Sequence, residues 1–242
     1  MNYFKTNGIE FCPEVVYFDA EHNFLIETFL PGKNVSQADF SLEQIDRFVS
    51  QLHQLFNLDV LQFDSYCTEN NFKKFRYQSP VESLELYGFE RFEEIDSAVV
   101  GSDVVNWISD KLNENLQYVQ GIDVRTEKLG FSWGDIQSKV IVDAAGDMFF
   151  YDFEHATIAN SFGLPYIKIH GSFTEKQFSY LLQRCTHYFG KTESELIDEI
   201  NKTEKIVRVN DVIWAAMMWS TERTEAFAKE TSRRMNRAAV LY

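Results

Sequence analysis

The chain has 242 residues, of which 45% are hydrophobic and 15% aromatic, and a formal net charge of -14 at pH 7. This hydrophobic content excludes a disordered chain, and the negative charge disfavours a nucleic-acid-binding protein because it repels phosphate backbones. The first residues lack the apolar core of a signal peptide, and no stretch approaches the roughly 18 apolar residues of a membrane span, so we expect a cytoplasmic protein that contacts no membrane.

The predicted elements begin with two strands. Residues 14–18 and 24–29 are rich in apolar and aromatic side chains, as is typical of β-strands. The second strand runs into Leu30-Pro31-Gly32, where proline and glycine predict that the strand ends.

A region of helices follows the strands. In residues 41–57 apolar side chains recur at steps of three and four residues, and Ser41 with Gln44 forms a capping box. A second helix is predicted to begin at Ser79-Pro80, with proline at the first helical position. A third helix is predicted over residues 102–120.

The segment with the most chemical information is a short hairpin flanked by two aspartates. The sequence Ser-Trp-Gly-Asp ends at Asp135, and two apolar runs, residues 139–143 and 147–151, surround a turn that contains Gly146. Asp152 follows the second run. The hairpin therefore predicts that Asp135 and Asp152 lie at neighbouring ends.

Two carboxylates so placed suit phosphoryl transfer. That reaction needs one carboxylate to accept the proton of the attacking hydroxyl and another to hold the magnesium ion on the phosphate oxygens. Asp135 and Asp152 suit these two roles respectively. The structural alternative is that each aspartate only caps a turn or a loop, because aspartate is a preferred turn residue.

Further helices are predicted after the hairpin. They cover residues 174–189, with Gly190 as the stop, then residues 192–201 and residues 207–237. Trp214 and Trp219 in the last region form either part of an aromatic box for a quaternary ammonium group or part of a helix core. No internal repeat or low-complexity linker interrupts this order, so we expect one helical lobe with a small sheet at its front.

These motifs together resemble the aminoglycoside phosphotransferase and choline kinase family. The catalytic loop of that family reads His-Gly-Asp-x-x-x-x-Asn, which is similar to the segment around Asp135. Its metal-binding strand ends in Asp-Phe-Glu or Asp-Trp-Glu, and this sequence has Asp152-Phe153-Glu154 after the second apolar run. Residues 24–32 resemble the strand and hinge between the two lobes of the family. Leu52-His53 resembles a Leu-His pair in the first helix of its large lobe, where the histidine is structural.

The resemblance implies an α+β, protein-kinase-like fold and ATP and Mg²⁺ as cofactors. Residues 1–35 would be a remnant of the small lobe with the hinge, and residues 36–242 the helical large lobe with the catalytic hairpin. Asp135 would be the catalytic base, and Asp152 and Gln137 would bind the metal. The expected nucleotide-binding residues are those of the hinge backbone and one lysine: Glu27, Thr28, Phe29, Leu30 and Lys139.

The sequence departs from the family on the nucleotide side. No glycine-rich phosphate loop and no Val-Ala-x-Lys strand occurs in it, so we expect most of the small lobe to be missing. Trp133 replaces the loop histidine, and Lys139 or Val140 stands where a second metal-binding asparagine belongs. Magnesium would then rest chiefly on Asp152, with Gln137 or Ser138 as a further oxygen donor.

The predicted function is ATP-dependent phosphoryl transfer to a hydroxyl of a small molecule, and the acidity of the chain favours a cationic one. The alternative is a binding or scaffold domain that kept the fold and lost the chemistry, because the loss of preorganised charges can cost about 100 to 1000-fold in rate for each contact. Three interpretations stay open: a fragment of a longer kinase, a degenerate relative, or an active minimal form in which Lys139 replaces one cation.

Overall fold

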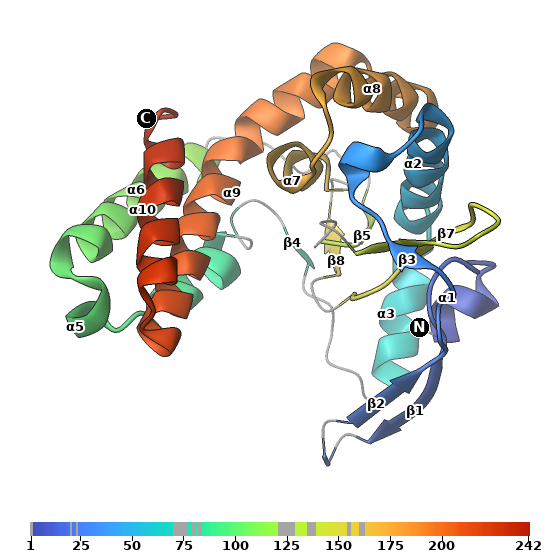
Figure 1. Ribbon diagram of the computed structural model, residues 1–242, viewed down its shortest axis with the longest axis horizontal. Coiled ribbons are helices and arrows are strands. Elements are labelled where there is room, and N and C mark those ends of the chain that lie inside the picture. The colour runs from blue at the N-terminus through green and yellow to red at the C-terminus, as the bar shows by residue number, and fades with distance from the viewer. Residues whose placement is uncertain are drawn as a thin grey trace. The chain divides into compact units, whose positions relative to one another are not determined.

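The computed structural model describes residues 2–19, 21–22, 24–69, 77–78, 81, 84–120, 129–134, 139–153, 156–159 and 163–242 (Figure 1). The chain forms two compact units, each described below by itself. Unit 1 comprises residues 1–76 and 128–197, and unit 2 comprises residues 77–127 and 198–242. The boundary between the units falls within one long helix, α9 (Glu193–Glu222).

Unit 1 contains the strands that carry the predicted site. Its helical elements are α1 (Asn2–Thr6), the 3₁₀-helix η1 (Gln37–Asp39), α2 (Leu42–Phe56), α3 (Val60–Glu69), α7 (Leu164–His170), α8 (Glu175–Phe189) and the first residues of α9. Its strands are β1 (Val15–Asp19), β2 (Phe24–Glu27), β3 (Lys33–Asn34), β5 (Gly130–Ser132), β6 (Val140–Val142), β7 (Met148–Phe150) and β8 (Thr157–Ala159). Unit 2 contains β4 (Tyr77–Gln78), the π-helix η2 (Glu85–Glu90), α5 (Ser97–Val100), α6 (Ser102–Gln120), the rest of α9 and α10 (Glu225–Ala239).

The strands of unit 1 pair in short antiparallel groups. β6 and β7 form a hairpin, with Val140 opposite Phe150 and Val142 opposite Met148, and β3 adds a third strand through Lys33 and Asn34. β5 pairs with β8. β1 pairs with β2, and a shift in register between Val15 and Tyr17 marks an irregularity in that pair.

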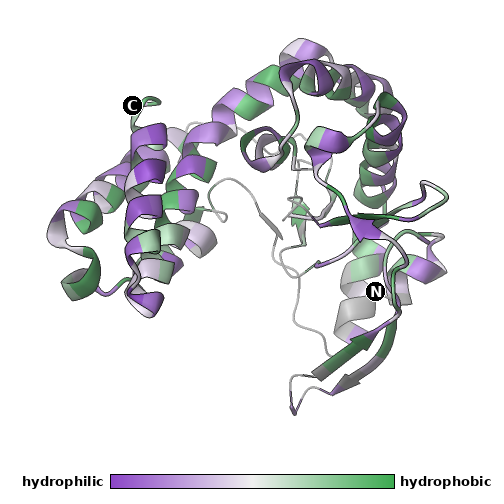
Figure 2. Ribbon diagram, viewed as in Figure 1, coloured by the Kyte–Doolittle hydropathy of each residue, from purple (hydrophilic) through white to green (hydrophobic). Residues whose placement is uncertain are grey.

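The β1–β2 hairpin exposes much of its apolar surface. Val16 is 64% exposed, Tyr17 51% and Leu25 48%. Figure 2 shows hydrophobic residues along both strands, and Figure 1 shows that the pair extends away from α2 and α8. Phe29, directly after β2, is 88% exposed.

An aromatic core fixes the β6–β7 hairpin of unit 1. Phe150 of β7 packs against Phe48 of α2 and against Phe11, with ring centroids 5.5 and 5.4 Å apart. On β5, the Phe131 ring contacts Phe4 of α1 at 5.1 Å and Phe63 of α3 at 5.5 Å. These phenylalanines therefore hold the short strands against the helices of unit 1.

Helix α8 packs on α2, and specific contacts set their position. The Arg184 guanidinium on α8 forms an ion pair with Asp46 on α2. The His53 ring lies edge-on to Phe189, with centroids 5.1 Å apart, which is a packing role and agrees with the structural role that the resemblance implied. The Gln177 side chain donates hydrogen bonds to the carbonyls of Ala38 and Phe40, at 3.0 and 2.9 Å.

Unit 2 is a helical unit with its own apolar core. Residues of η2, α6, α9 and α10 make up this core, with Ile108, Leu112, Val212, Ile213 and Ala216 among those fully buried. None of the helices in the described parts of the chain combines the length and the apolar composition that a membrane crossing needs.

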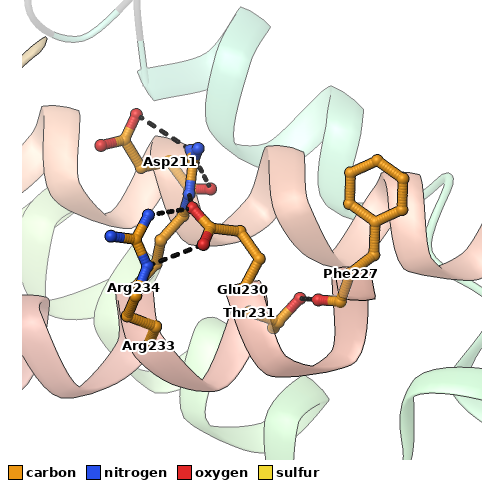
Figure 3. Close-up of polar contacts among 6 residues, drawn as sticks. All are labelled: Asp211, Phe227, Glu230, Thr231, Arg233 and Arg234. Atoms are coloured by element: carbon orange, nitrogen blue, oxygen red, sulfur yellow. Dashed lines mark hydrogen bonds and ion pairs between the residues drawn. The ribbon is translucent and has the colours of Figure 1, made fainter. Parts of the chain in front are cut away.

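A charged cluster ties α10 to α9 within unit 2 (Figure 3). Two arginines converge on the Glu230 carboxylate: Arg233 Nε and Arg234 Nε each donate at 2.7 Å. Arg234 also donates to the carbonyl oxygen of Asp211 at 3.2 Å, and its guanidinium lies 4.9 Å from the ring centroid of Trp214. One face of Trp214 is therefore occupied by a cation of the protein itself, which argues against the aromatic box for a bound ammonium group.

The structure confirms most predicted helices and corrects one boundary. The predictions for residues 41–57, 102–120 and 174–189 correspond to α2, α6 and α8, and the capping box of Ser41 and Gln44 is formed. The four predicted strands correspond to β1, β2, β6 and β7 within two residues at each end. The predicted helix start at Ser79-Pro80 lies outside the described residues.

The predicted break between residues 201 and 207 is wrong, because α9 continues through this segment. No glycine or proline occurs there, and Ile206 and Val207 are buried, so nothing ends the helix. The break falls instead at Arg223, whose φ is 52°, and at Thr224, whose hydroxyl accepts a hydrogen bond from the backbone N–H of Phe227.

We predict that Gly32→Ala destabilises the protein more than Gly146→Ala does. Both glycines have positive φ, 120° and 85°, so both substitutions introduce backbone strain. A Cβ at Gly32 would also lie 2.3 Å from the carbonyl oxygen of Val142 on β6, whereas a Cβ at Gly146 meets no atom within 4 Å. Overpacking of this kind costs about 1–3 kcal/mol, so urea unfolding should separate the two variants by that amount. Equal losses would show that the approach of residue 32 to β6 is not tight.

The Glu230 cluster predicts a pH dependence. Hydrogen bonds from Arg233, and then from Arg234, lower the pKa of Glu230 to about 2 against the opposing effect of burial. Because the pKa is lower in the folded state, the stabilisation is present above the unfolded pKa of about 4.3 and is lost as the pH falls towards 2.

Glu230→Gln should therefore lower the free energy of unfolding by up to about 1 kcal/mol at pH 7, a value suited to partly exposed pairs, and by less at pH 3. Urea unfolding at both pH values measures the difference. Glu225→Gln is the matched control, because the pair of Glu225 with Lys229 on the same helix is highly exposed, with side chains 80% and 75% accessible. A Glu230 effect that does not shrink at pH 3 would contradict the ion-pair explanation.

Candidate active site

The β6–β7 hairpin places Lys139 beside Asp152. The ladder continues one residue beyond the strands, because the backbone N–H of Tyr151 donates to the carbonyl of Lys139 at 3.2 Å. Asp152 is the next residue along the chain, and the Lys139 ammonium forms an ion pair with its Oδ2. At the other end of the hairpin, the Asp143 carboxylate accepts the backbone N–H groups of Ala145 and Asp147, both at 2.8 Å, which fixes the turn.

Trp133 holds the backbone of Asp152. The indole is 1% exposed and stacks on Phe150, with ring centroids 4.4 Å apart and an interplanar angle of 14°. Its Nε1–H donates to the carbonyl oxygen of Asp152 at 3.0 Å. Asp152 has a φ of 62°, a left-handed conformation that a residue with a side chain adopts only when its surroundings enforce it.

The surroundings of Lys139 are partly polar and partly aromatic. The side chains of Lys139 and Asp152 are 30% and 25% exposed, so the pair is accessible to solvent. The Lys139 ammonium also lies 5.9 Å from the ring centroid of Tyr151, whose hydroxyl accepts a hydrogen bond from Asn34 Nδ2 at 3.0 Å. Asn34 of β3, Lys139 just before β6 and Tyr151 just after β7 therefore lie at the same corner.

Glu27 adds a second carboxylate to the electrostatic surroundings of Asp152. Burial raises the pKa of Glu27, and the negative charge of Asp152 acts in the same direction. Glu27 is the last residue of β2, so the end of the N-terminal hairpin is near enough to Asp152 for their charges to interact. Glu27 and Asp152 thus contribute negative charge, and Lys139 positive charge, to this corner of unit 1.

The predicted hinge residues differ in the backbone groups that they leave available. The N–H of Thr28 donates to the carbonyl of Glu14 at 2.8 Å, and the hydroxyl of Thr28 accepts the N–H of Glu14 at 2.9 Å. The backbone amides of Phe29 and Leu30 have no hydrogen-bond partner within the described residues. Within the part of the chain that the structure describes, the amides of Phe29 and Leu30 are therefore donors that a ligand such as adenine could use.

Other predicted site residues lie outside the described residues. These are Asp135 and Gln137, together with Ser138. Gly134, the residue before Asp135, has a φ of 83°, and Trp133 contacts Asp152, so the described chain is close to Asp152 two residues before it reaches Asp135.

Within the described residues, Asp152 is the predicted magnesium ligand, and the carboxylate of Glu27 is near enough for the two charges to interact. No group of three or more histidine, cysteine, aspartate or glutamate residues gathers within the described ranges in a way that could hold a metal. Asp152 is a hard oxygen donor of the kind that magnesium prefers, but its Oδ2 already contacts the Lys139 ammonium. A metal ion could use Asp152 only by sharing its carboxylate with Lys139 or displacing the lysine, and Gln137, the further ligand that the sequence suggests, lies outside the described residues.

Two features of the site were not predicted. The first is the hydrogen bond from Trp133 to Asp152; the sequence signal was the tryptophan at the position of the loop histidine, because both side chains carry a ring N–H donor. The second is the Lys139–Asp152 ion pair. The hairpin register could have predicted it, because symmetric pairing about the turn places Lys139 opposite Tyr151.

We predict that Trp133→Phe lowers the free energy of unfolding by about 1–3 kcal/mol, because the stack on Phe150 is kept while a buried carbonyl loses its donor. The matched control is Trp107→Phe on α6, where the indole is partly buried and has no hydrogen-bond partner within the described residues. Urea unfolding measures both variants. Equal effects would mean that the bond to Asp152 contributes nothing beyond the loss of indole packing.

The arrangement of these elements is similar to that of known small-molecule kinases. The Plasmodium vivax ethanolamine kinase superposes with a TM-score of 0.69 at 14% identity, over 98% of this chain and 70% of that chain. A choline/ethanolamine kinase family protein from Mesorhizobium loti gives 0.70 at 12%, over 99% and 76%. The gentamicin-APH(2")-IIa complex gives 0.64 at 12%, over 97% and 77%.

The sequence itself matches no protein-family model and no curated protein. At identities this low, the structural similarity establishes the fold alone. The predicted fold class is confirmed. The chain has the protein-kinase-like fold of choline and ethanolamine kinases and aminoglycoside phosphotransferases, as the resemblance of the two aspartate motifs implied.

Proposed function

We propose that this protein is a phosphotransferase that uses ATP to phosphorylate a hydroxyl group of a small molecule. The observation that supports this most directly is the placement of Asp152. Its carboxylate follows a strand of a kinase-like fold, its backbone is held by Trp133, and an ammonium group lies on one of its oxygens. In phosphoryl transfer a carboxylate holds the metal ion that accompanies the phosphates, and a cationic side chain contacts the phosphates themselves.

In this proposal each predicted site residue has one role. Asp135 accepts the proton of the substrate hydroxyl as the oxygen attacks the terminal phosphorus atom, and the bond from that phosphorus to the bridging oxygen breaks to release ADP. Asp152 and Gln137 are the ligands of magnesium, which supplies positive charge to the phosphate oxygens when bound. The backbone of the hinge, from Glu27 to Leu30, meets the adenine ring, and Lys139 contacts the phosphates.

The substrate class is a small molecule that carries an alcohol. The names of the structural neighbours refer to ethanolamine, choline and gentamicin, all of which are amines. An acidic chain with a net charge of -14 would attract such a cation, and we propose a cytoplasmic protein that acts on a soluble amine.

One observation favours a second candidate, a kinase-like binding domain without activity. The Lys139 ammonium neutralises Asp152, and the sequence contains no glycine-rich phosphate loop. A domain of this kind would keep the fold and bind a partner without nucleotide and without turnover. The two candidates differ in their response to ATP and magnesium.

The test is thermal unfolding with and without millimolar ATP and magnesium. A ligand that binds only the native state adds about 2.7 kcal/mol at 100 times its Kd, which raises the melting temperature by several degrees. Asp152→Ala should remove the magnesium dependence of this shift. Asp135→Ala should keep the shift and abolish phosphate transfer to an added amino alcohol or aminoglycoside.

Asp147→Ala is the matched control for these variants. Asp147 lies on the same hairpin, is 63% exposed and pairs with Arg47 at 2.8 Å, away from Asp152. It should retain both the shift and its magnesium dependence. A wild-type protein that shows no shift at millimolar nucleotide would contradict the phosphotransferase function and favour the binding domain.

A further inference from the structure

The Lys139–Asp152 ion pair joins one fixed and one adjustable partner. The backbone of Asp152 is held by the Trp133 indole, which is buried and stacked on Phe150. The Lys139 backbone is fixed by its bond to Tyr151, but its ammonium sits on a four-carbon stem with several rotatable bonds. If the pair opens, the Lys139 ammonium can move away while the backbone of Asp152 stays in place.

Opening this pair requires little free energy. Both side chains are partly exposed, at 30% and 25%, and ion pairs accessible to solvent contribute little because water screens them. The Tyr151 ring, 5.9 Å from the ammonium, gives the lysine a second favourable contact. A stronger anion near the hairpin could therefore draw the ammonium away from Asp152.

The pair also affects what Asp152 can bind. A divalent cation that approaches this carboxylate meets the positive charge of the Lys139 ammonium, which contacts Oδ2. Repulsion between like charges a few ångströms apart is substantial even in a partly solvated site. Free metal is therefore disfavoured at Asp152 for as long as Lys139 remains on it.

We propose that Lys139 masks Asp152 from free divalent cations until the phosphates of a nucleotide take its ammonium. Without nucleotide, Lys139 holds Oδ2 of Asp152. With nucleotide, the ammonium turns to the phosphate oxygens and the carboxylate becomes available to the metal. Lys139 thus makes metal binding conditional on nucleotide, and this second half rests on the proposed phosphotransferase function.

The first experiment uses metal alone and does not depend on that function. Mn²⁺ is titrated into the nucleotide-free protein, and free Mn²⁺ is counted by electron paramagnetic resonance. Lys139→Met, which keeps most of the side-chain volume and removes the charge, should raise the Mn²⁺ affinity at least about tenfold over the wild type. The double variant Lys139→Met with Asp152→Asn should lose this gain.

Two control variants separate masking from general charge effects. Lys139→Arg keeps the positive charge and should remain as weak in Mn²⁺ binding as the wild type. Lys5→Met removes the same charge from another ion pair of unit 1, that of Lys5 with Glu14 at 2.6 Å, and should change the affinity less than twofold. Melting curves without ligand identify any variant that fails to fold, in which case Lys139→Gln replaces Lys139→Met.

The second experiment measures the thermal shift by ATP in the presence of EDTA. The wild type should show a shift that Lys139→Met loses, because the ammonium contacts the phosphates. An Mn²⁺ affinity of Lys139→Met equal to that of the wild type would overturn the masking, even if ATP binds. A gain of Mn²⁺ affinity with no ATP shift under any condition would instead overturn the exchange with phosphate and the phosphotransferase function together.

Discussion

The contact between Trp133 and Asp152 is the constraint on which the candidate site depends. Stacking on Phe150 orients the indole, and the indole N–H then satisfies the carbonyl of a residue in left-handed conformation. Without that donor, the carbonyl would lose a bond in a largely buried setting, and the backbone could relax to an ordinary conformation. The aromatic core of unit 1 thus holds the backbone from which the Asp152 carboxylate projects, beside the Lys139 ammonium.

The charges around this contact limit the chemistry. Glu27 and Asp152 contribute negative charge and Lys139 positive charge; burial raises the pKa of Glu27, and the negative charge of Asp152 acts in the same direction. Such a corner repels a bare triphosphate. A nucleotide can be held there only if it brings a cation of its own or if the ammonium turns from the carboxylate to the phosphate. In either case the position of the Lys139 ammonium determines whether the negative charge of Asp152 is neutralised.

Local patterns predicted much of the fold, and contacts distant in sequence accounted for the rest. The periodicity of α2, α6 and α8 and the apolar runs of β6 and β7 were sufficient because their signals lie within each segment. β5 and β8 lack a run of three apolar residues like those of β6 and β7, and they are strands because they pair with each other. α1 is short and forms where Tyr3 and Phe4 enter the aromatic core, which the sequence around them does not indicate. In the site, the apolar runs of the sequence place Lys139 and Asp152 at the two ends of the hairpin, but their pairing depends on a ladder bond one residue beyond the strands.

The conformation of Asp152 argues that this residue is present for function rather than for stability. Within the described residues, it and Arg223 are the non-glycine residues with positive φ. Although aspartate tolerates this region better than most residues, glycine would adopt it at no steric cost. The partly exposed pair with Lys139 offers up to about 1 kcal/mol in return, which does not exceed the strain of about 1 kcal/mol or more that it must offset. A carboxylate held under strain at the end of a buried strand, with a movable ammonium beside it, is better explained by a ligand that uses both charges than by the needs of the fold.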